Sequence, residues 1–171
     1  MPAGSRGFKY IIDLVDNLTG WVEAQALCKL RVTVIVDFLF EVMCCFGCIF
    51  QLTCDNRMEF KGAVEELMCK YNVPVVCILP YNSQVNGKIE RTQHMYIEAI
   101  WKVLQGEMDQ WPLWLGYTLW ADRITVKRNT GYSLYYLLYG QHPLLPFDIT
   151  DSMFHALDWP KVTTTKDLLA L

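Results

Sequence analysis

The order of apolar segments along the chain limits its fold more than any other feature of the sequence. Runs rich in β-branched and aromatic residues, which are typical of strands, alternate with segments whose apolar residues recur at helical spacing. We expect strands at 8–15, 21–27, 49–54 and 73–79, and helices at 33–46, 60–71, 90–105 and 111–123. Two strands followed by alternating helices and strands predict an α/β fold in which helices cover a mixed sheet.

The composition is that of one folded domain with a core of its own. The chain has 171 residues, of which 53% are hydrophobic and 19% are charged, and this balance excludes an intrinsically disordered chain. The net charge is -3, whereas proteins that coat DNA are usually basic. Any binding of nucleic acid must therefore rest on local patches.

The cysteines and one long apolar stretch bear on the compartment. Seven cysteines without a signal peptide predict a reducing, intracellular environment and mostly buried thiols, including those of Cys44 and Cys45 at a helix end. The stretch 32–52 is long enough to span a membrane, but Asp37 and Glu41 interrupt it. We expect a buried helix followed by a strand there, and no contact with a membrane.

A polar stretch follows the last predicted strand. Residues 79–91, LPYNSQVNGKIER, bring amide, hydroxyl and glycine residues together just ahead of a glutamate. A plain connection from strand to helix does not need so many donors and acceptors. We therefore predict a loop that contacts a polar partner, with Glu90 at the start of the next helix. The alternative is a loop that only contacts solvent.

Two carboxylates follow neighbouring strands of the predicted sheet. Asp55 comes directly after one strand, and Glu90 follows the loop after the next, so both can reach the same edge of the sheet. Carboxylate oxygens bind Mg²⁺, and paired metal ions can clamp the attacking and leaving oxygens of a phosphodiester displacement. The alternative is that Asp55 caps a turn with Asn56 and Glu90 caps the following helix. The spacing of two acids does not decide between these interpretations.

Three motifs in this order extend that argument: LTCDNRMEFKGAVEEL, LPYNSQVNGKIER and TGYSLYYLLYG. Together they resemble the integrase catalytic core of Ty3/Gypsy-type retrotransposons, which is related to the cores of retroviral integrases. The resemblance covers residues 1–150 and leaves 151–171 as a carboxyl-terminal tail. It implies an RNase H-like fold and a D,D,E set that binds two divalent metal ions, Mg²⁺ or Mn²⁺. It also implies 3′-end processing and DNA strand transfer.

The resemblance assigns roles to individual residues in and around the polar stretch. Asp55 and Glu90 correspond to catalytic, metal-binding acids of the family, and Gly87 would permit a turn in the loop. The residues that would contact DNA are Tyr81, Asn82, Gln84, Asn86, Lys88, Arg91 and His94. The expected partners are the DNA ends of the element, target DNA and further copies of the chain. A functional protein of this kind would work in the nucleus.

The sequence also departs from the family pattern. The family's first aspartate lies on the first, central strand, shortly before a Met-Pro pair, and here that pair is Met1 and Pro2. We therefore expect a sheet that lacks its first strand and its first catalytic acid, weakened metal binding, and no activity of the chain alone. Arg57 replaces a glycine of the pattern and Leu134 replaces a proline, as drift in a degenerate copy would produce.

Two other functions are compatible with the same residues. In the first, Asp13 on the second strand of the family pattern completes the metal site of an active phosphotransferase, while Asp16 begins the turn before Gly20. In the second, the chain is a non-catalytic module that binds DNA or associates with itself. Binding of Mg²⁺ or Mn²⁺ separates the first function from the others, and affinity for duplex DNA without metal separates the second.

Overall fold

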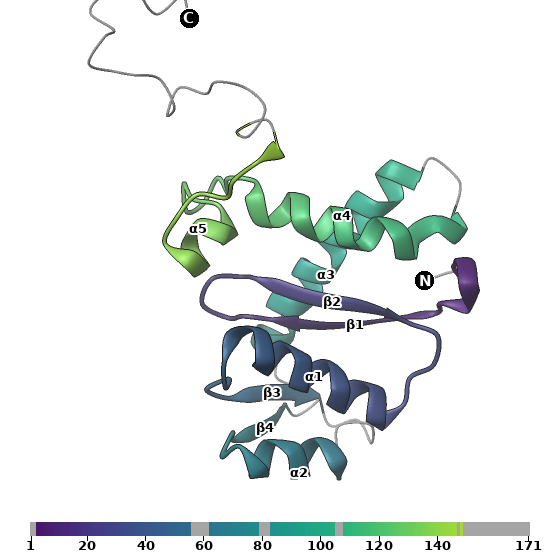
Figure 1. The fold of residues 1–171 in the computed structure, drawn as a ribbon, viewed down its shortest axis with the longest axis vertical. Coiled ribbons are helices and arrows are strands. Elements are labelled where there is room, and N and C mark those ends of the chain that lie inside the picture. Colours follow the sequence, from purple (N-terminus) through teal and green to yellow (C-terminus); the bar gives the residue numbers. More distant parts are fainter. Residues whose placement is uncertain (1–2, 56–61, 79–82, 105–107, 147, 149–171) are drawn as a thin grey trace, which may run out of the picture.

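The computed structural model describes residues 3–55, 62–78, 83–104, 108–146 and 148, with the backbone alone for 78, 83–92 and 108. A hairpin of two strands forms the middle layer of the fold (Figure 1). Long helices lie on one side of this hairpin, and a helix, a second pair of strands and a short helix lie on the other.

The middle layer consists of β1 (Tyr10–Val15) and β2 (Val22–Leu27), which pair antiparallel. Asp16 begins the turn between them, as predicted, and its carboxylate accepts a hydrogen bond from the backbone N–H of Thr19 at 2.9 Å. Gly20 closes the turn with a φ of 82°, a conformation that residues with a Cβ rarely adopt. The turn therefore fixes which residues of the two strands face each other.

One core lies between the hairpin and the elements that follow it: α1 (Val32–Phe46), β3 (Leu52–Asp55), α2 (Ala63–Lys70) and β4 (Val75–Ile78). The apolar residues of α1 recur at helical spacing and form one buried stripe. The buried residues of this core are Ile12, Leu27, Ile35, Phe38, Leu39, Val42, Met43, Leu52, Val64, Met68 and Val73.

A second core lies on the opposite face of the hairpin. It is formed with α3 (Ser83–Leu104) and α4 (Trp111–Ile124), and Ile11 and Val15 of β1 pack against it, whereas Ile12 enters the first core. This alternation follows from the two-residue period of a strand. The buried residues of the second core are Val22, Tyr96, Ile100, Leu104, Trp111, Leu115 and Leu119.

Arg123 joins α4 to the hairpin. Its guanidinium lies 4.4 Å from the ring centroid of Trp21, donates a hydrogen bond of 2.6 Å to the carbonyl of Val22, and pairs with Glu23 at 2.9 Å. The last helix, α5 (Leu134–Tyr139), contacts α4, and its residue Tyr139 packs edge-on against the same Trp21 ring. The Arg123 guanidinium and the aromatic rings around Trp21 thus hold α4 and α5 against the middle layer.

The predicted α/β fold with a missing central strand is confirmed. In the described part of the chain the strands form two separate sheets, β1 with β2 and β3 with β4, and β3 and β4 run parallel. The resemblance places the family's first strand between β1 and β3, and in the described part of the chain these two strands do not pair with each other. Each of the two sheets therefore has an edge on the side where that strand would lie.

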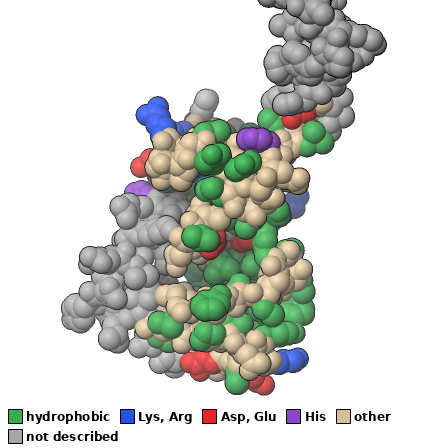
Figure 2. Space-filling model, turned by 90° about the vertical axis from the view of Figure 1, so that its left-hand side faces the viewer, with side chains coloured by type: hydrophobic (Ala, Val, Ile, Leu, Met, Phe, Trp, Pro, Cys, Tyr) green, Lys and Arg blue, Asp and Glu red, His purple; other side chains and the backbone are tan. Residues whose placement is uncertain are grey.

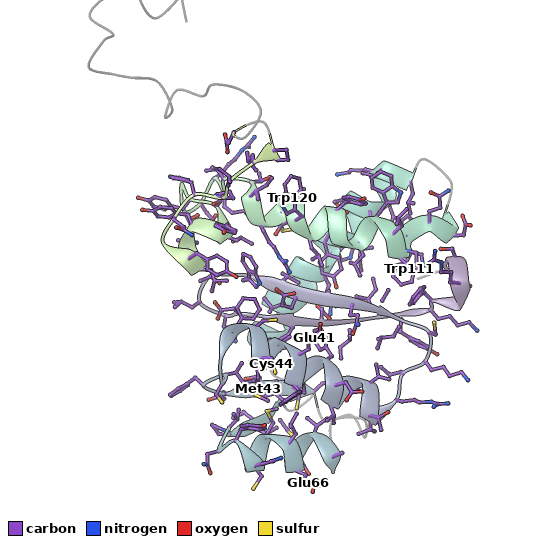
Figure 3. The ribbon with its side chains drawn as sticks, in the orientation of Figure 1. Glu41, Met43, Cys44, Glu66, Trp111 and Trp120 are labelled. Carbon is purple, nitrogen blue, oxygen red and sulfur yellow. The ribbon has the colours of Figure 1, made fainter. Side chains whose placement is uncertain are left out.

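The prediction of mostly buried thiols was wrong. Cys54 is buried, but the other six cysteines are exposed. Figure 3 shows Met43 and Cys44 as neighbours on α1, where Met43 is the last member of the buried stripe and Cys44 lies off it. The apolar stretch 32–52 forms α1 and the segment leading into β3. Among the residues described, no helix combines the length and apolar character that crossing a membrane requires.

Candidate functional site

Asp55 lies where the sequence predicted it, at the carboxyl end of a strand. In β3 the side chains of Leu52 and Cys54 are buried and those of Thr53 and Asp55 are half-buried, as alternation along a strand requires. Asp55 stands opposite Ile78, the last residue of β4, in the parallel register. Both strands therefore end at one edge of the sheet, which is the usual place of functional residues in α/β folds.

The helix that carries Glu90 begins earlier than predicted. The polar stretch was expected to remain a loop up to Glu90, but α3 begins at Ser83. Val85 lies about three helical turns before Tyr96, and Ile89 lies about three turns before Ile100. The apolar spacing of the helix therefore continues through the polar stretch. One helical glycine costs about 1 kcal/mol relative to alanine, which such a helix can sustain.

This correction changes how the predicted contact residues are placed. Four of them, Gln84, Asn86, Lys88 and Arg91, lie in the first half of α3, together with the predicted metal ligand Glu90. Two more of the predicted contact residues, Tyr81 and Asn82, lie outside the described residues. A helix, and not an extended loop, therefore supplies most of the surface that the sequence assigned to a polar partner.

His94 continues this part of α3 and is exposed. Its Nδ1 lies 3.8 Å from a carboxylate oxygen of Glu98, and the other oxygen of Glu98 lies 3.9 Å from Nζ of Lys102. The exposed fraction of these three side chains is between 61% and 82%, so water screens both pairs and they hold the side chains weakly. His94 and Lys102 can exchange Glu98 for another anion at little cost.

A half-buried carboxylate faces α3 from the middle layer. The Nε2 of Gln93 donates hydrogen bonds to both carboxylate oxygens of Asp13, at 2.9 and 3.0 Å. Burial raises the pKa of Asp13 above its usual value, while hydrogen bonds from Gln93 and Tyr96 lower it in part. Burial and the neighbouring Asp13 also raise the pKa of Tyr96, which is therefore a neutral donor.

The structure thus brings Asp13 next to the helix that carries Glu90. Gln93 follows Glu90 by three residues, so the two occupy neighbouring positions on α3, one turn apart. The sequence analysis did not identify Gln93 or Tyr96 as partners of Asp13. The spacing of Gln93 from Glu90 was the only available signal that Gln93 lies near the site. It could not reveal the contact of Gln93 with Asp13, because these residues are 80 positions apart in the sequence. In the described part of the chain, no three His, Cys, Asp or Glu side chains lie together as a metal site would require.

Comparison with known sequences relates the chain to viral polyproteins. No family model matches it. The chain is 31% identical over 145 residues to the Gag-Pol polyprotein of avian reticuloendotheliosis virus, which covers 84% of this chain and 12% of that protein. It is 28% identical over 170 residues to the Pol polyprotein of Radiation murine leukemia virus (strain Kaplan), covering 98% of this chain and 28% of that protein. The chain thus spans less than a third of the length of these relatives.

Several solved structures of viral proteins have the same fold. A chain of the simian T-cell lymphotropic virus intasome in complex with PP2A regulatory subunit B56 gamma superposes with a TM-score of 0.69 and 17% identity, covering 80% of this chain and 50% of that chain. The HTLV-2 integrase catalytic core domain in complex with magnesium, in its trimeric form, superposes with a TM-score of 0.66 and 16% identity. The match covers 80% of this chain and 89% of that chain. The catalytic core domain of BIV integrase superposes with a TM-score of 0.65 and 20% identity, covering 76% of this chain and 85% of that chain. At these identities, the likeness establishes the fold.

Proposed function

We propose that this chain, which belongs to the integrase superfamily and has the fold of its catalytic core, serves DNA integration by a retroelement and is inactive alone. The observation that supports this most is the position of Asp55 at the carboxyl end of β3, in a chain related to Pol polyproteins over 84% of its length. The assignment to the Ty3/Gypsy type remains a prediction that agrees with a retroelement origin.

Asp55 and Glu90 are the residues that would hold a divalent metal ion. Both offer hard carboxylate oxygens, which suit Mg²⁺ or Mn²⁺, and the HTLV-2 core has been solved with magnesium. A bound ion would supply positive charge to the phosphodiester at the point of displacement. The donors fit the ion in kind but are few, because Asp55 belongs to no group of three ligands among the described side chains. We therefore expect weak binding of metal.

The first half of α3 would contact DNA. Lys88 and Arg91 are three residues apart on the helix, so both can approach one phosphate backbone, and the exposed His94 follows one turn later. With a net charge of -3, the chain offers DNA no general attraction, so binding would be weak and sensitive to salt. The HTLV-2 core has been solved in trimeric and dimeric forms, which supports self-association here as a further proposal.

A salt titration of DNA binding tests this proposal. The parent chain, the double variant Lys88→Ala/Arg91→Ala and the control Lys29→Ala/Lys70→Ala are titrated with a labelled duplex at several salt concentrations. The control loses the same charge at exposed positions away from α3. Each lost phosphate contact should reduce the slope of log affinity against log salt by about 0.9. We expect a flatter slope for the α3 variant alone. Equal slopes for that variant and the parent would exclude α3 as the contact surface.

An active phosphotransferase that uses Asp13 is the second candidate. It is favoured by the contact of Asp13 with Gln93, one turn from Glu90. It is disfavoured because both carboxylate oxygens of Asp13 already accept hydrogen bonds from an amide, and burial favours the protonated form. Calorimetric titration with Mn²⁺ separates the candidates, since metal binding that is lost in Asp13→Asn would support the active enzyme. Metal-independent affinity for duplex DNA, with no metal binding at all, would support a purely DNA-binding module.

A further inference from the structure

The edge of β1 that faces away from β2 carries backbone groups directed toward the second sheet. The N–H of Asp16 donates to the carbonyl of Trp21 at 2.8 Å, which places the hydrogen-bonded pairs of the hairpin at even-numbered residues of β1. The N–H and C=O groups of Ile11, Asp13 and Val15 therefore point away from β2. No strand pairs with this edge in the described part of the chain.

The edge of β3 that faces away from β4 has the same property. The N–H of Leu52 donates to the carbonyl of Pro74 at 3.0 Å, so Leu52 and Cys54 direct their backbone groups toward β4. The backbone groups of Gln51 and Thr53 point the other way. Figure 1 shows β1 and β3 running in opposite directions, so a strand between them would be antiparallel to one of them and parallel to the other.

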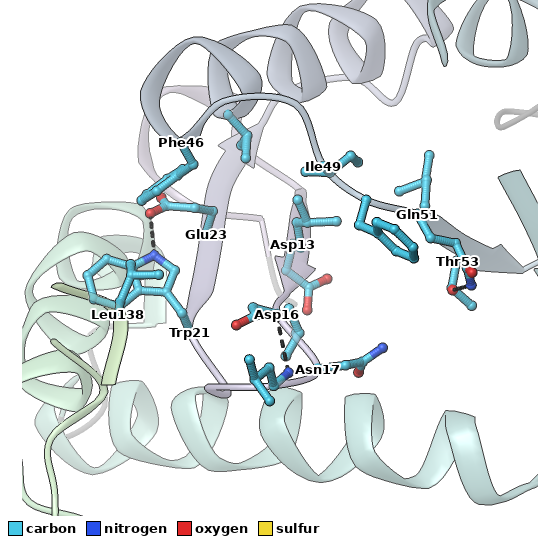
Figure 4. A pocket seen from close by; sticks show the side chains of 16 residues that line it. Asp13, Asp16, Asn17, Trp21, Glu23, Phe46, Ile49, Gln51, Thr53 and Leu138 are labelled. Carbon is cyan, nitrogen blue, oxygen red and sulfur yellow. Dashed lines mark hydrogen bonds between the residues drawn. The ribbon is translucent and has the colours of Figure 1, made fainter. Parts of the chain in front are cut away.

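A cavity of about 540 Å³ lies between these two edges. It is lined by Asp13 and Val15 of β1 and by Gln51 and Thr53 at β3, the same residues whose backbone groups point away from β2 and β4. Figure 4 shows Asp13, Gln51 and Thr53 among the side chains that line it. The lining also includes apolar side chains of α1 and of the segment after it, namely Val42, Phe46, Ile49 and Phe50. Figure 2 shows this face of the molecule hollowed at its middle, with hydrophobic and acidic atoms inside the hollow.

The charge of the lining indicates what the occupant must carry. Among the described residues, three acids line the cavity, Asp13, Asp16 and Glu23, and no lysine or arginine does. Asp16 is engaged by its turn and Glu23 by Arg123, whereas the hydrogen-bond partners of Asp13 are the neutral side chains of Gln93 and Tyr96. A positively charged side chain on the α3 face of an inserted strand would therefore complement Asp13. On the α1 face, the apolar lining favours apolar residues.

We propose that the slot between β1 and β3 binds an extended peptide as an added central strand. The peptide pairs with both edges through its backbone, places apolar residues toward α1 at alternate positions, and places a basic residue beside Asp13. Backbone pairing supplies the affinity in this mode of recognition, and alternate side chains supply the specificity. This binding does not depend on the proposed role in DNA integration.

Titration with synthetic peptides tests this proposal on the full chain. The probe is the capped peptide Val-Thr-Val-Lys-Val-Thr-Val, in which valines occupy one face and lysine the other. We expect saturable binding of one peptide per chain, with slower amide hydrogen exchange at Asp13, Val15 and Thr53. The same peptide N-methylated at both threonines loses backbone donors and should bind at least about tenfold more weakly. A glutamate in place of the lysine should also weaken binding, because it would face Asp13.

Variants of the chain distinguish peptide binding in the slot from non-specific binding to the surface. In Asp13→Asn the preference for the lysine peptide over the glutamate peptide should disappear, whereas Asp37→Asn, which removes an exposed charge from α1, should retain it. The proposal is overturned by the absence of saturable binding, or by equal affinity for the N-methylated peptide. It is also overturned if the same amides become protected without peptide as the protein concentration rises, since a second copy of the chain would then fill the slot.

Discussion

Asp13 is a carboxylate that the fold holds in a half-buried position with neutral donors. Its pKa is raised from 3.8, mainly by burial, although Gln93 and Tyr96 both donate to it. Because the folded chain binds the proton more tightly than the unfolded chain does, the contribution of this group to stability is fully present below pH 3.8 and is lost as the pH rises through the folded pKa. At neutral pH the ionised form therefore lowers the free energy of unfolding.

Replacing Asp13 by asparagine should stabilise the chain at neutral pH. Asparagine keeps an acceptor for Gln93 without the buried charge, so we expect the melting temperature to rise by a few degrees. The difference from the parent should shrink as the pH falls toward 3.8. Thermal melts followed by circular dichroism over this range measure the effect, with Asp37→Asn as the exposed control. A variant less stable than the parent at neutral pH would show that the ionised carboxylate is needed.

The cysteines offer a second test at the scale of residues. Burial, followed by the neighbouring Cys77, raises the pKa of Cys54 to about 11, and the two residues stand opposite each other on β3 and β4. Thiolate is the reactive form, so alkylation at mildly alkaline pH should modify the exposed Cys77 well before Cys54. Cys54 should become reactive only as the pH approaches 11 or the chain unfolds. Mass spectrometry of peptides reads both rates, and equal rates would contradict the burial of Cys54.

At the scale of elements, local spacing was sufficient to predict most strands and helices, because their buried faces repeat at the period of the element. The predicted helix 33–46 differs from α1 by one residue at its start. The start of α3 was missed because the amides and glycine of the polar stretch favour turns, while the apolar spacing of Val85 and Ile89 favours a helix. The contact of Asp13 with Gln93 could not be predicted, since it depends on how α3 packs on the hairpin.

Gly87 tests the helical start of α3. If residues 83–87 are helical, Gly87→Ala should raise the free energy of unfolding by about 0.5–1 kcal/mol. Gly116 in α4 is the matched control, because an added Cβ would meet nothing within 4 Å there. Gly20 has a φ of 82°, so Gly20→Ala should instead lower the free energy of unfolding. Chemical denaturation of the three variants gives the comparison. If Gly87→Ala behaves like Gly20→Ala, the polar stretch is a loop.

At the scale of the whole molecule, two cores enclose a hairpin, and a slot separates that hairpin from the second sheet. The resemblance to integrase cores predicted this gap, because the missing strand would lie between β1 and β3. The three-dimensional arrangement of Asp55 and Glu90 could not be predicted from the sequence, since it depends on the path of the chain between β4 and α3. The roles assigned to both acids remain predictions.

The most direct test of the central claim is DNA strand transfer. The unmodified chain is incubated with Mg²⁺ or Mn²⁺ and a duplex that carries the end of the element. We expect no product, because Asp55 and Glu90 without a shared third acid leave the attacking oxygen poorly placed, and misplacement is costly in rate. An extended chain with an aspartate-bearing first strand, combined with Arg57→Gly, should recover some product. That product should be lost again in Asp55→Asn or Glu90→Gln. Product from the unmodified chain that Asp13→Asn abolishes would contradict the account.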